Sequence, residues 1–217
     1  MPEYELIVVN ATSQNGTFCL YQPASSEEQI ALMPVAWFTK SAAATSRVYF
    51  RWQIEYNFVW GETGKLSPGE IFDVTQIWPA DPVTENHVTL TKQGDVYTFD
   101  DLRQGQAGSL TITADGTVPP DMLSAGIGMS GAPTMIVQAM PNLQTMFTPR
   151  PRYRVAFGQV KPRQILGPAP LPNSADIEFP PNIFSMTATL NINYTWTIEV
   201  NPLPMAMEIP PPPEAQL

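Results

Sequence analysis

The sequence lacks most of the groups that build disulfides, metal centres and membrane spans. It holds one cysteine, Cys19, so no disulfide can form within the chain, and one histidine, His87, so sites with several histidine ligands are excluded. No run approaches the roughly 18 apolar residues needed to cross a bilayer. The N-terminus has no basic segment followed by a signal-type apolar stretch. A cytoplasmic protein without membrane insertion is therefore expected, while an export signal removed earlier or release by a non-classical route stays open.

Charge of either sign is also scarce. Charged residues make up 14% of the chain, against about 25% in average soluble domains. The net charge of −9 argues against a nucleic-acid partner, because phosphates require a basic surface. The 24 prolines interrupt helices, so the composition favours an all-β protein.

The clearest pattern lies between residues 50 and 60, where every even position is large and apolar. The intervening odd positions are mostly polar, so the stretch alternates with period two. Such alternation predicts a strand with one buried face, and we expect one long central strand over residues 47–60. A face this rich in aromatic rings favours a second sheet as its packing partner. The apolar members are Phe50, Trp52, Ile54, Tyr56, Phe58 and Trp60.

Short candidate strands separated by turn residues occupy most of the remaining chain, which is typical of a sandwich or barrel. Two hairpins are indicated, with turns at residues 93–95 and 191–193. A short helix is expected from Ser25 or Ser26 to a residue before Pro34. The candidate strands are residues 4–10, 16–22, 35–39, 70–77, 88–92, 96–99, 109–113, 134–139, 145–147, 153–160, 175–179, 184–191 and 194–200.

A charge-poor segment follows, since residues 104–149 contain no lysine or arginine. Its glycine-rich centre, residues 124–131, is interpreted first as a core strand whose glycines allow close approach of another backbone. The alternative is an adaptable surface that contacts another protomer, with Met129 and Met135 as the candidate contact residues. The five methionines in this region are Met122, Met129, Met135, Met140 and Met146.

Arginines and prolines supply the other candidate protomer contacts. Arg150, Arg152 and Arg154 would line one face of a strand. This face is either a charged strand edge that resists mispairing, or a surface complementary to an acidic protomer, or a polyanion site. The C-terminal tail is a polyproline-II candidate that could lie on a neighbouring copy, through Pro210, Pro211, Pro212 and Pro213.

No group of residues predicts a reaction or a cofactor. Cys19 with His87 could form a nucleophile–base pair, but Cys19 lies in an alternating apolar strand that favours a buried thiol. His87 is expected on the surface. Two carboxylates suffice for glycoside hydrolysis, yet neighbouring acids such as Asp100 and Asp101 point to opposite faces of a strand. Asp176 and Glu178 would share one face of an exposed edge.

Trp78 is the candidate contact for neutral carbohydrate, because sugar faces stack on exposed aromatic rings. It lies in a segment with Pro79 and Pro82 that is interpreted as a loop. The alternative is a structural tryptophan that closes one end of the sandwich.

Several segments resemble the rhizosphere-expressed Rhi protein family of root-nodule bacteria. The resemblance covers the chain to about Val200 and implies an abundant, soluble bacterial protein without catalytic residues to transfer. It is carried by residues 15–22, 35–38, 52–60, 76–81, 126–131 and 185–191.

Together these features predict an antiparallel β-sandwich of jelly-roll or immunoglobulin-like type over residues 1–200, followed by an extended proline-rich tail over residues 201–217. We expect a non-catalytic structural protein that self-associates into a homo-oligomer or filament. The alternative is a lectin-like module that binds carbohydrate.

Overall fold

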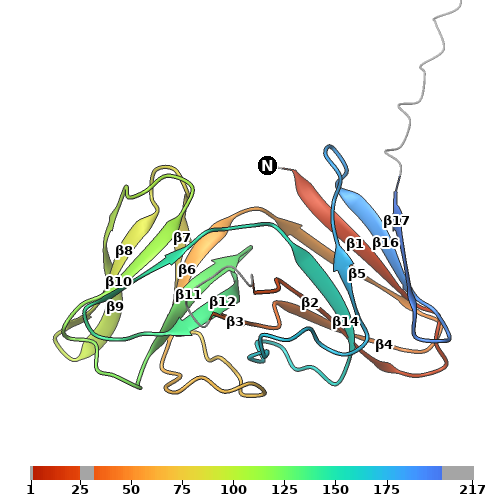
Figure 1. Cartoon of the computed structure of the whole chain (residues 1–217), viewed down its shortest axis with the longest axis horizontal. Coiled ribbons are helices and arrows are strands. Elements are labelled where there is room, and N and C mark those ends of the chain that lie inside the picture. The colour runs from red at the N-terminus through yellow and green to blue at the C-terminus, as the bar shows by residue number, and fades with distance from the viewer. Residues whose placement is uncertain (1, 25–31, 202–217) are drawn as a thin grey trace, which may run out of the picture.

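The computed structural model describes residues 2–24 and 32–201. Within these ranges the chain forms 17 strands in four sheets and no helix (Figure 1), so the all-β prediction is confirmed. The helix predicted between Ser25 and Pro34 falls on residues 25–31, and the proline tail falls on residues 202–217. Both predictions therefore lie outside the described residues, except that β3 already begins at Met33 and that Asn201 of the predicted tail is described.

Two of the sheets combine strands from the two ends of the chain. They lie together in one half of the molecule, on the right in Figure 1. In order across each sheet, sheet A contains β17 (Trp196–Val200), β16 (Ser185–Leu190), β1 (Glu3–Asn10) and β5 (Arg47–Gln53), and sheet B contains β15 (Ser174–Ile177), β14 (Tyr153–Gly158), β2 (Gly16–Tyr21) and β4 (Phe38–Ala42).

The other two sheets are built almost entirely from the middle of the chain and form the half on the left in Figure 1. Sheet C contains β3 (Met33–Pro34), β12 (Ala132–Gln138), β11 (Ser124–Met129), β6 (Tyr56–Gly61) and β7 (Gln76–Ala80), and sheet D contains β13 (Leu143–Phe147), β10 (Leu110–Ala114), β8 (His87–Gln93) and β9 (Val96–Arg103).

The long central strand predicted over residues 47–60 does not exist as one strand. The chain leaves the sheet at Ile54 and Glu55, so β5 pairs with β1 in sheet A and β6 pairs with β11 in sheet C. The apolar residues stay on one side of the chain across the break, although β5 and β6 pair with different strands. Period two reports which face is buried, but it does not report how long one hydrogen-bonded ladder continues.

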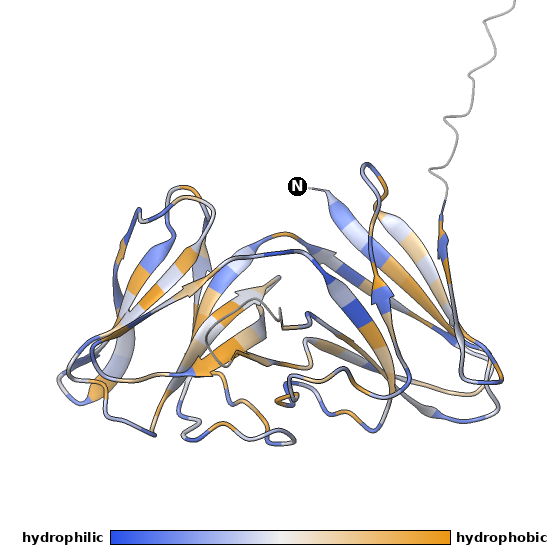
Figure 2. Ribbon diagram, in the orientation of Figure 1, coloured by the Kyte–Doolittle hydropathy of each residue, from blue (hydrophilic) through white to orange (hydrophobic). Residues whose placement is uncertain are grey.

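The apolar row consequently feeds two hydrophobic clusters. Phe50 and Trp52 belong to the cluster between sheets A and B, together with Leu6 and Phe18. Phe58 and Trp60 belong to the cluster between sheets C and D. All four aromatic side chains of the row named here are at most 3% exposed, as the alternation predicts. Figure 2 shows the corresponding bands of hydrophobic and hydrophilic residues along the strands.

A tight turn between β11 and β12 holds the break in place. Ser130 and Gly131 both have positive φ, 50° and 73°, which suits a two-residue hairpin turn. The Ser130 hydroxyl donates to the Gln53 carbonyl oxygen (2.7 Å), and the Ser130 amide donates to the Glu55 carbonyl oxygen (2.8 Å). This turn therefore satisfies backbone groups that the break would leave unpaired.

Two further expectations need correction. Two of the four sheets are mixed rather than purely antiparallel, since β1 pairs with β16 in parallel in sheet A and β8 pairs with β10 in parallel in sheet D. Sheets B and C are antiparallel throughout, as predicted. The strand predicted over residues 70–77 begins only at Gln76. The preceding loop is anchored by the fully buried Phe72 and by a bridge between Ile71 and Gln164. Both hairpins predicted at residues 93–95 and 191–193 are present.

Candidate functional site

The arginine-rich segment lies between the two halves. Only Arg154 belongs to a strand, β14, whereas Arg150 and Arg152 lie in the segment that connects β13 to β14. The prediction that all three arginines line one strand face is therefore wrong, because the chain becomes a strand only at Tyr153.

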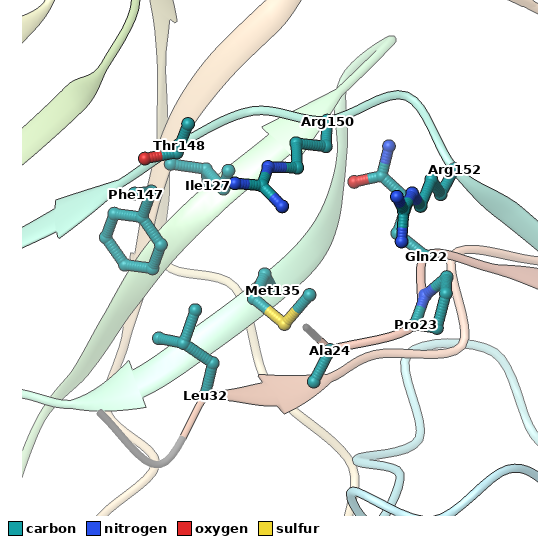
Figure 3. A pocket seen from close by; sticks show the side chains of 10 residues that line it. All are labelled: Gln22, Pro23, Ala24, Leu32, Ile127, Met135, Phe147, Thr148, Arg150 and Arg152. Carbon is teal, nitrogen blue, oxygen red and sulfur yellow. The ribbon is translucent and has the colours of Figure 1, made fainter. Parts of the chain in front are cut away.

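A cavity opens where this segment crosses from one half to the other. Arg150, Arg152 and Gln22 stand at its polar side, and Figure 3 shows both guanidinium groups above an apolar floor. Such a cavity can accept a small apolar group beside a positive charge. The apolar lining comes from both halves of the chain and consists of Pro23, Ala24, Leu32, Ile127, Met135 and Phe147.

A wider groove adjoins this cavity and shares Arg152 with it. The positive and negative side chains along this groove largely neutralise each other. The Arg154 guanidinium donates from Nε and Nη2 to the two carboxylate oxygens of Asp176 (2.8 and 2.7 Å), and the ion pair raises the pKa of Arg154. Glu178 also lines the groove. Asp176 and Glu178 thus lie along the exposed edge predicted for them, and Asp176 is engaged by an arginine.

The glycine-rich strand β11 is part of the core. Met129 is fully buried and Met135 is 8% exposed. A side chain on Gly126 or Gly128 would collide with the backbone of β12, so these glycines allow the close approach that the first interpretation predicts. Because Met129 has no exposed surface and Met135 faces the cavity between the halves, neither side chain is available on the outer surface for another copy.

Other apolar side chains of the charge-poor segment do reach the surface. Three of them, which we call the methionine rim, lie at or next to the open side of the cluster between sheets C and D. Met140 and Leu143 border an apolar opening there, and the backbone of Leu123 bonds to Ala139 close by. Prolines and an aspartate lie next to these side chains in the sequence. Such residues mark turns, so they could have indicated that the side chains are exposed. The rim consists of Met122 (55% exposed), Met140 (40%) and Leu143 (45%). Met146 is also exposed, but it lies on the other face of sheet D, because its buried neighbours Thr145 and Phe147 face the cluster.

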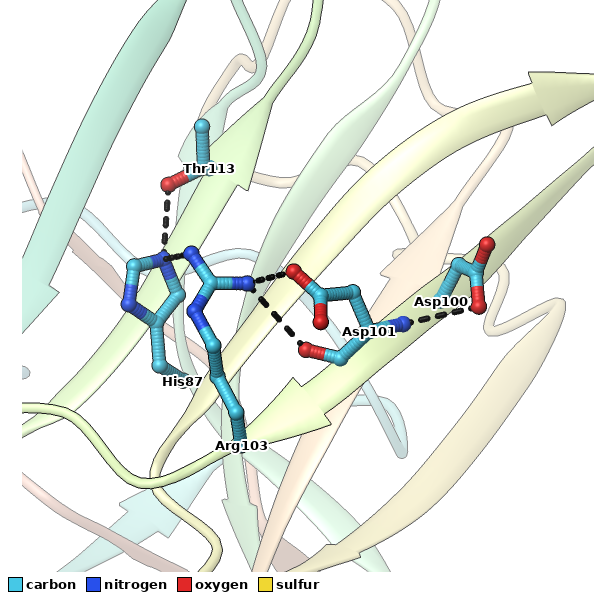
Figure 4. Close-up of polar contacts among 5 residues, drawn as sticks. All are labelled: His87, Asp100, Asp101, Arg103 and Thr113. Carbon is cyan, nitrogen blue, oxygen red and sulfur yellow. Dashed lines mark hydrogen bonds and ion pairs between the residues drawn. The ribbon is translucent and has the colours of Figure 1, made fainter.

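His87 forms the one polar cluster that contains a histidine. Its Nε2 lies 2.9 Å from the Thr113 hydroxyl and 3.2 Å from Nη2 of Arg103, which also bonds Asp101 (Figure 4). Since arginine can only donate, Nε2 accepts and the imidazole is neutral. Burial, followed by the Arg103 charge, lowers the pKa of His87. His87 is half-buried, rather than on the surface as predicted.

This lowered pKa predicts a pH-dependent stability. At a pH between the ordinary histidine pKa of about 6.5 and the lower pKa of the folded state, His87 binds a proton in the unfolded state but not in the folded state. Stability should therefore fall as the pH decreases below about 6.5, and His87→Gln should remove this part of the dependence. Urea unfolding of both proteins at pH 8, 7, 6 and 5 measures it. A stability difference between the two proteins that is constant with pH would contradict the assignment.

The remaining candidate catalytic groups do not converge. Cys19 is fully buried in β2, where burial raises the pKa of its thiol to about 12, while His87 lies in β8 in the other half. The nucleophile–base pair is therefore not formed. Asp100 accepts from Gln93, and Asp101 bonds Arg103. The described residues contain no group of three or more histidine, cysteine, aspartate or glutamate side chains that could hold a metal.

Trp78 lies in strand β7, not in a loop. It is half-buried and packs on Phe99 with ring centroids 5.9 Å apart. The tail prolines Pro210, Pro211, Pro212 and Pro213 lie outside the described residues. No helix in the described part of the chain is long and apolar enough to span a membrane.

Comparison with known proteins identifies relatives over nearly the whole chain. The family model described as RhiA matches residues 1–201. Protein RhiA of Rhizobium leguminosarum bv. viciae is 32% identical over 204 residues, which cover 92% of this chain and 87% of that protein. No solved structure matches. The resemblance to the Rhi family found in the sequence is thus confirmed.

Proposed function

This chain belongs to the RhiA family, and we propose that it is a non-catalytic structural protein that associates with copies of itself through the methionine rim. The observation that carries the proposal is the exposure of Met140 and Leu143 at an apolar opening, with the exposed Met122 next to the buried Leu123 of the same cluster. Exposed apolar groups that cluster on a soluble protein mark contact sites, and methionine side chains adapt to varied partners.

The charge distribution supports contact at the same surface. Copies with a net charge of −9 repel one another, and the repulsion is least where charge is least. Residues 104–149 contain no basic residue, and their acidic residues are Asp115 and Asp121. Both carboxylates border the rim, because Asp121 precedes Met122 and the Asp115 carbonyl oxygen accepts from the Asn142 amide, so contact there brings few like charges together.

The absence of catalysis is part of the proposal. It is supported by the burial of Cys19 and by the pairing of Asp101 and Asp176 with arginines. A sandwich arrangement is supported by the two clusters, each of which draws its residues from two sheets. Assignment to the jelly-roll or immunoglobulin-like class stays a proposal, because the parallel pairs depart from a purely antiparallel order.

Self-association should appear as a mass above the monomer value of 24.0 kDa that rises with concentration in sedimentation equilibrium. A Met140→Glu substitution places a like charge in the rim and should weaken association at least about 10-fold. Ile192→Glu is the matched control, because Ile192 is 74% exposed in the turn after β16. A monomeric mass at every concentration would overturn the proposal.

The alternative, carbohydrate binding through Trp78, has weaker support. Its ring packs against Phe99 and is half-buried, so less of the aromatic face is available for stacking with a sugar. A glycan array in which Trp78→Ala abolishes a hit seen with the unmodified chain would favour this alternative.

A further inference from the structure

Among the described residues, the outer strand of sheet D, β13, lacks the usual protection of a sheet edge. Natural edge strands carry charged residues, prolines or bulges, which prevent pairing with another chain. β13 has the sequence Leu-Gln-Thr-Met-Phe and contains neither a charge nor a proline. Every other edge strand of the four described sheets contains at least one such residue: Glu199 in β17, Arg47 and Arg51 in β5, Asp176 in β15, Lys40 in β4, Pro34 in β3, Pro79 in β7, and Asp100, Asp101 and Arg103 in β9.

The free backbone groups of β13 can be assigned from the pairing on its inner side. The Thr111 amide donates to the Asn86 carbonyl oxygen, on the β8 side of β10, so its backbone points away from β13. Met146 stands opposite Thr111 and Gln144 opposite Thr113. In an antiparallel ladder these are non-hydrogen-bonded pairs, so Gln144 and Met146 direct their N–H and C=O groups to the outer edge, where no other described strand pairs with β13.

The partner that suits this edge is a second copy of the same strand. It is uncharged, so pairing with itself places no like charges opposite each other. It also adjoins the methionine rim, because Leu143 belongs to both the strand and the rim. Pairing would therefore continue the sheet and give Leu143 an apolar cross-strand neighbour, Phe147 of the other copy.

We propose that two copies join their β13 strands in antiparallel fashion about a two-fold axis at Thr145, forming one continuous sheet from two copies of sheet D. This inference rests on the proposed self-association and names its interface. In this register Gln144 of each copy faces Met146 of the other, and both pairs exchange two backbone hydrogen bonds. The contact is isologous, so the product is a closed dimer.

A proline at the outward amide tests the pairing with little effect on the fold. Met146→Pro removes a donor that faces away from β10 and should raise the dimer dissociation constant at least about 30-fold in sedimentation equilibrium of the full chain. Met146→Ala keeps the amide and should raise it less than about 10-fold. The matched control is Val200→Pro on the edge strand β17, because Asn201 donates to the Ser185 carbonyl oxygen and its neighbour Val200 therefore faces outward.

The outcomes separate the two proposals. If the unmodified chain is monomeric throughout, self-association itself is wrong. If it dimerises and Met146→Pro dimerises equally well, the β13 interface is wrong while self-association stands. Should Met146→Pro fail to fold, amide hydrogen exchange on the unmodified chain decides. The Gln144 and Met146 amides should then be protected at high concentration and should exchange freely on dilution, and equal exchange at both concentrations would overturn the interface.

Discussion

Replacement of Phe58 by alanine is expected to lower the free energy of unfolding by about 3–5 kcal/mol, the range for large-to-small changes at a buried phenylalanine. Phe58 is fully buried between sheets C and D and contacts the Phe99 ring edge-to-face, with centroids 6.1 Å apart. The loss combines the transfer of the side chain with a cavity that neighbouring strands cannot close. Urea unfolding followed by tryptophan fluorescence measures it.

Ile192→Ala serves as the control for this experiment. Ile192 is 74% exposed, so its truncation should change stability by less than about 0.5 kcal/mol. A loss below about 1 kcal/mol for Phe58→Ala would mean that this side chain is not part of a packed core and that the division of the apolar row between two clusters is wrong.

Gly126→Ala should cost about 3 kcal/mol, although it adds only one methyl group. The new Cβ would overlap the carbonyl oxygen of Met135 and lie 2.7 Å from Cα of Ile136. Both atoms belong to the backbone of β12, so no side-chain rotation relieves the collision. The strands must separate, and the ladder between β11 and β12 weakens.

The matched control is Gly158→Ala at the end of β14, where an added Cβ meets no atom within 4 Å. That substitution should leave stability within about 0.5 kcal/mol of the parent. Thermal unfolding of both variants under one buffer condition gives the comparison. Equal stability of the two variants would show that β11 and β12 lie farther apart at Gly126 than described.

Much of the local structure follows from the sequence, because it depends on neighbouring residues. The alternation around Phe50 and Phe58 identifies the buried face, and the turn at Gly94 identifies a hairpin. The glycine-rich stretch predicts close backbone approach, which Gly126 confirms. Each of these signals is a property of a few consecutive residues.

The candidate sites were less predictable, because exposure depends on distant strands. Met129, Met135, Met140 and Met146 all lie in the same charge-poor segment. The first two are nevertheless buried and the last two exposed. Nor does the sequence around Arg152 reveal that it borders a cavity shared by two halves of the chain.

The sequence by itself determined the β-structure, the face of the apolar row that enters the hydrophobic cores, and the family. Only the tertiary structure decided that the apolar row from Phe50 to Trp60 is divided between two cores, and that β13 is left as an uncharged edge. The physical reason is that side-chain alternation is set within one strand, whereas the identity of the neighbouring strand is set by hydrogen bonds to residues far away in the chain.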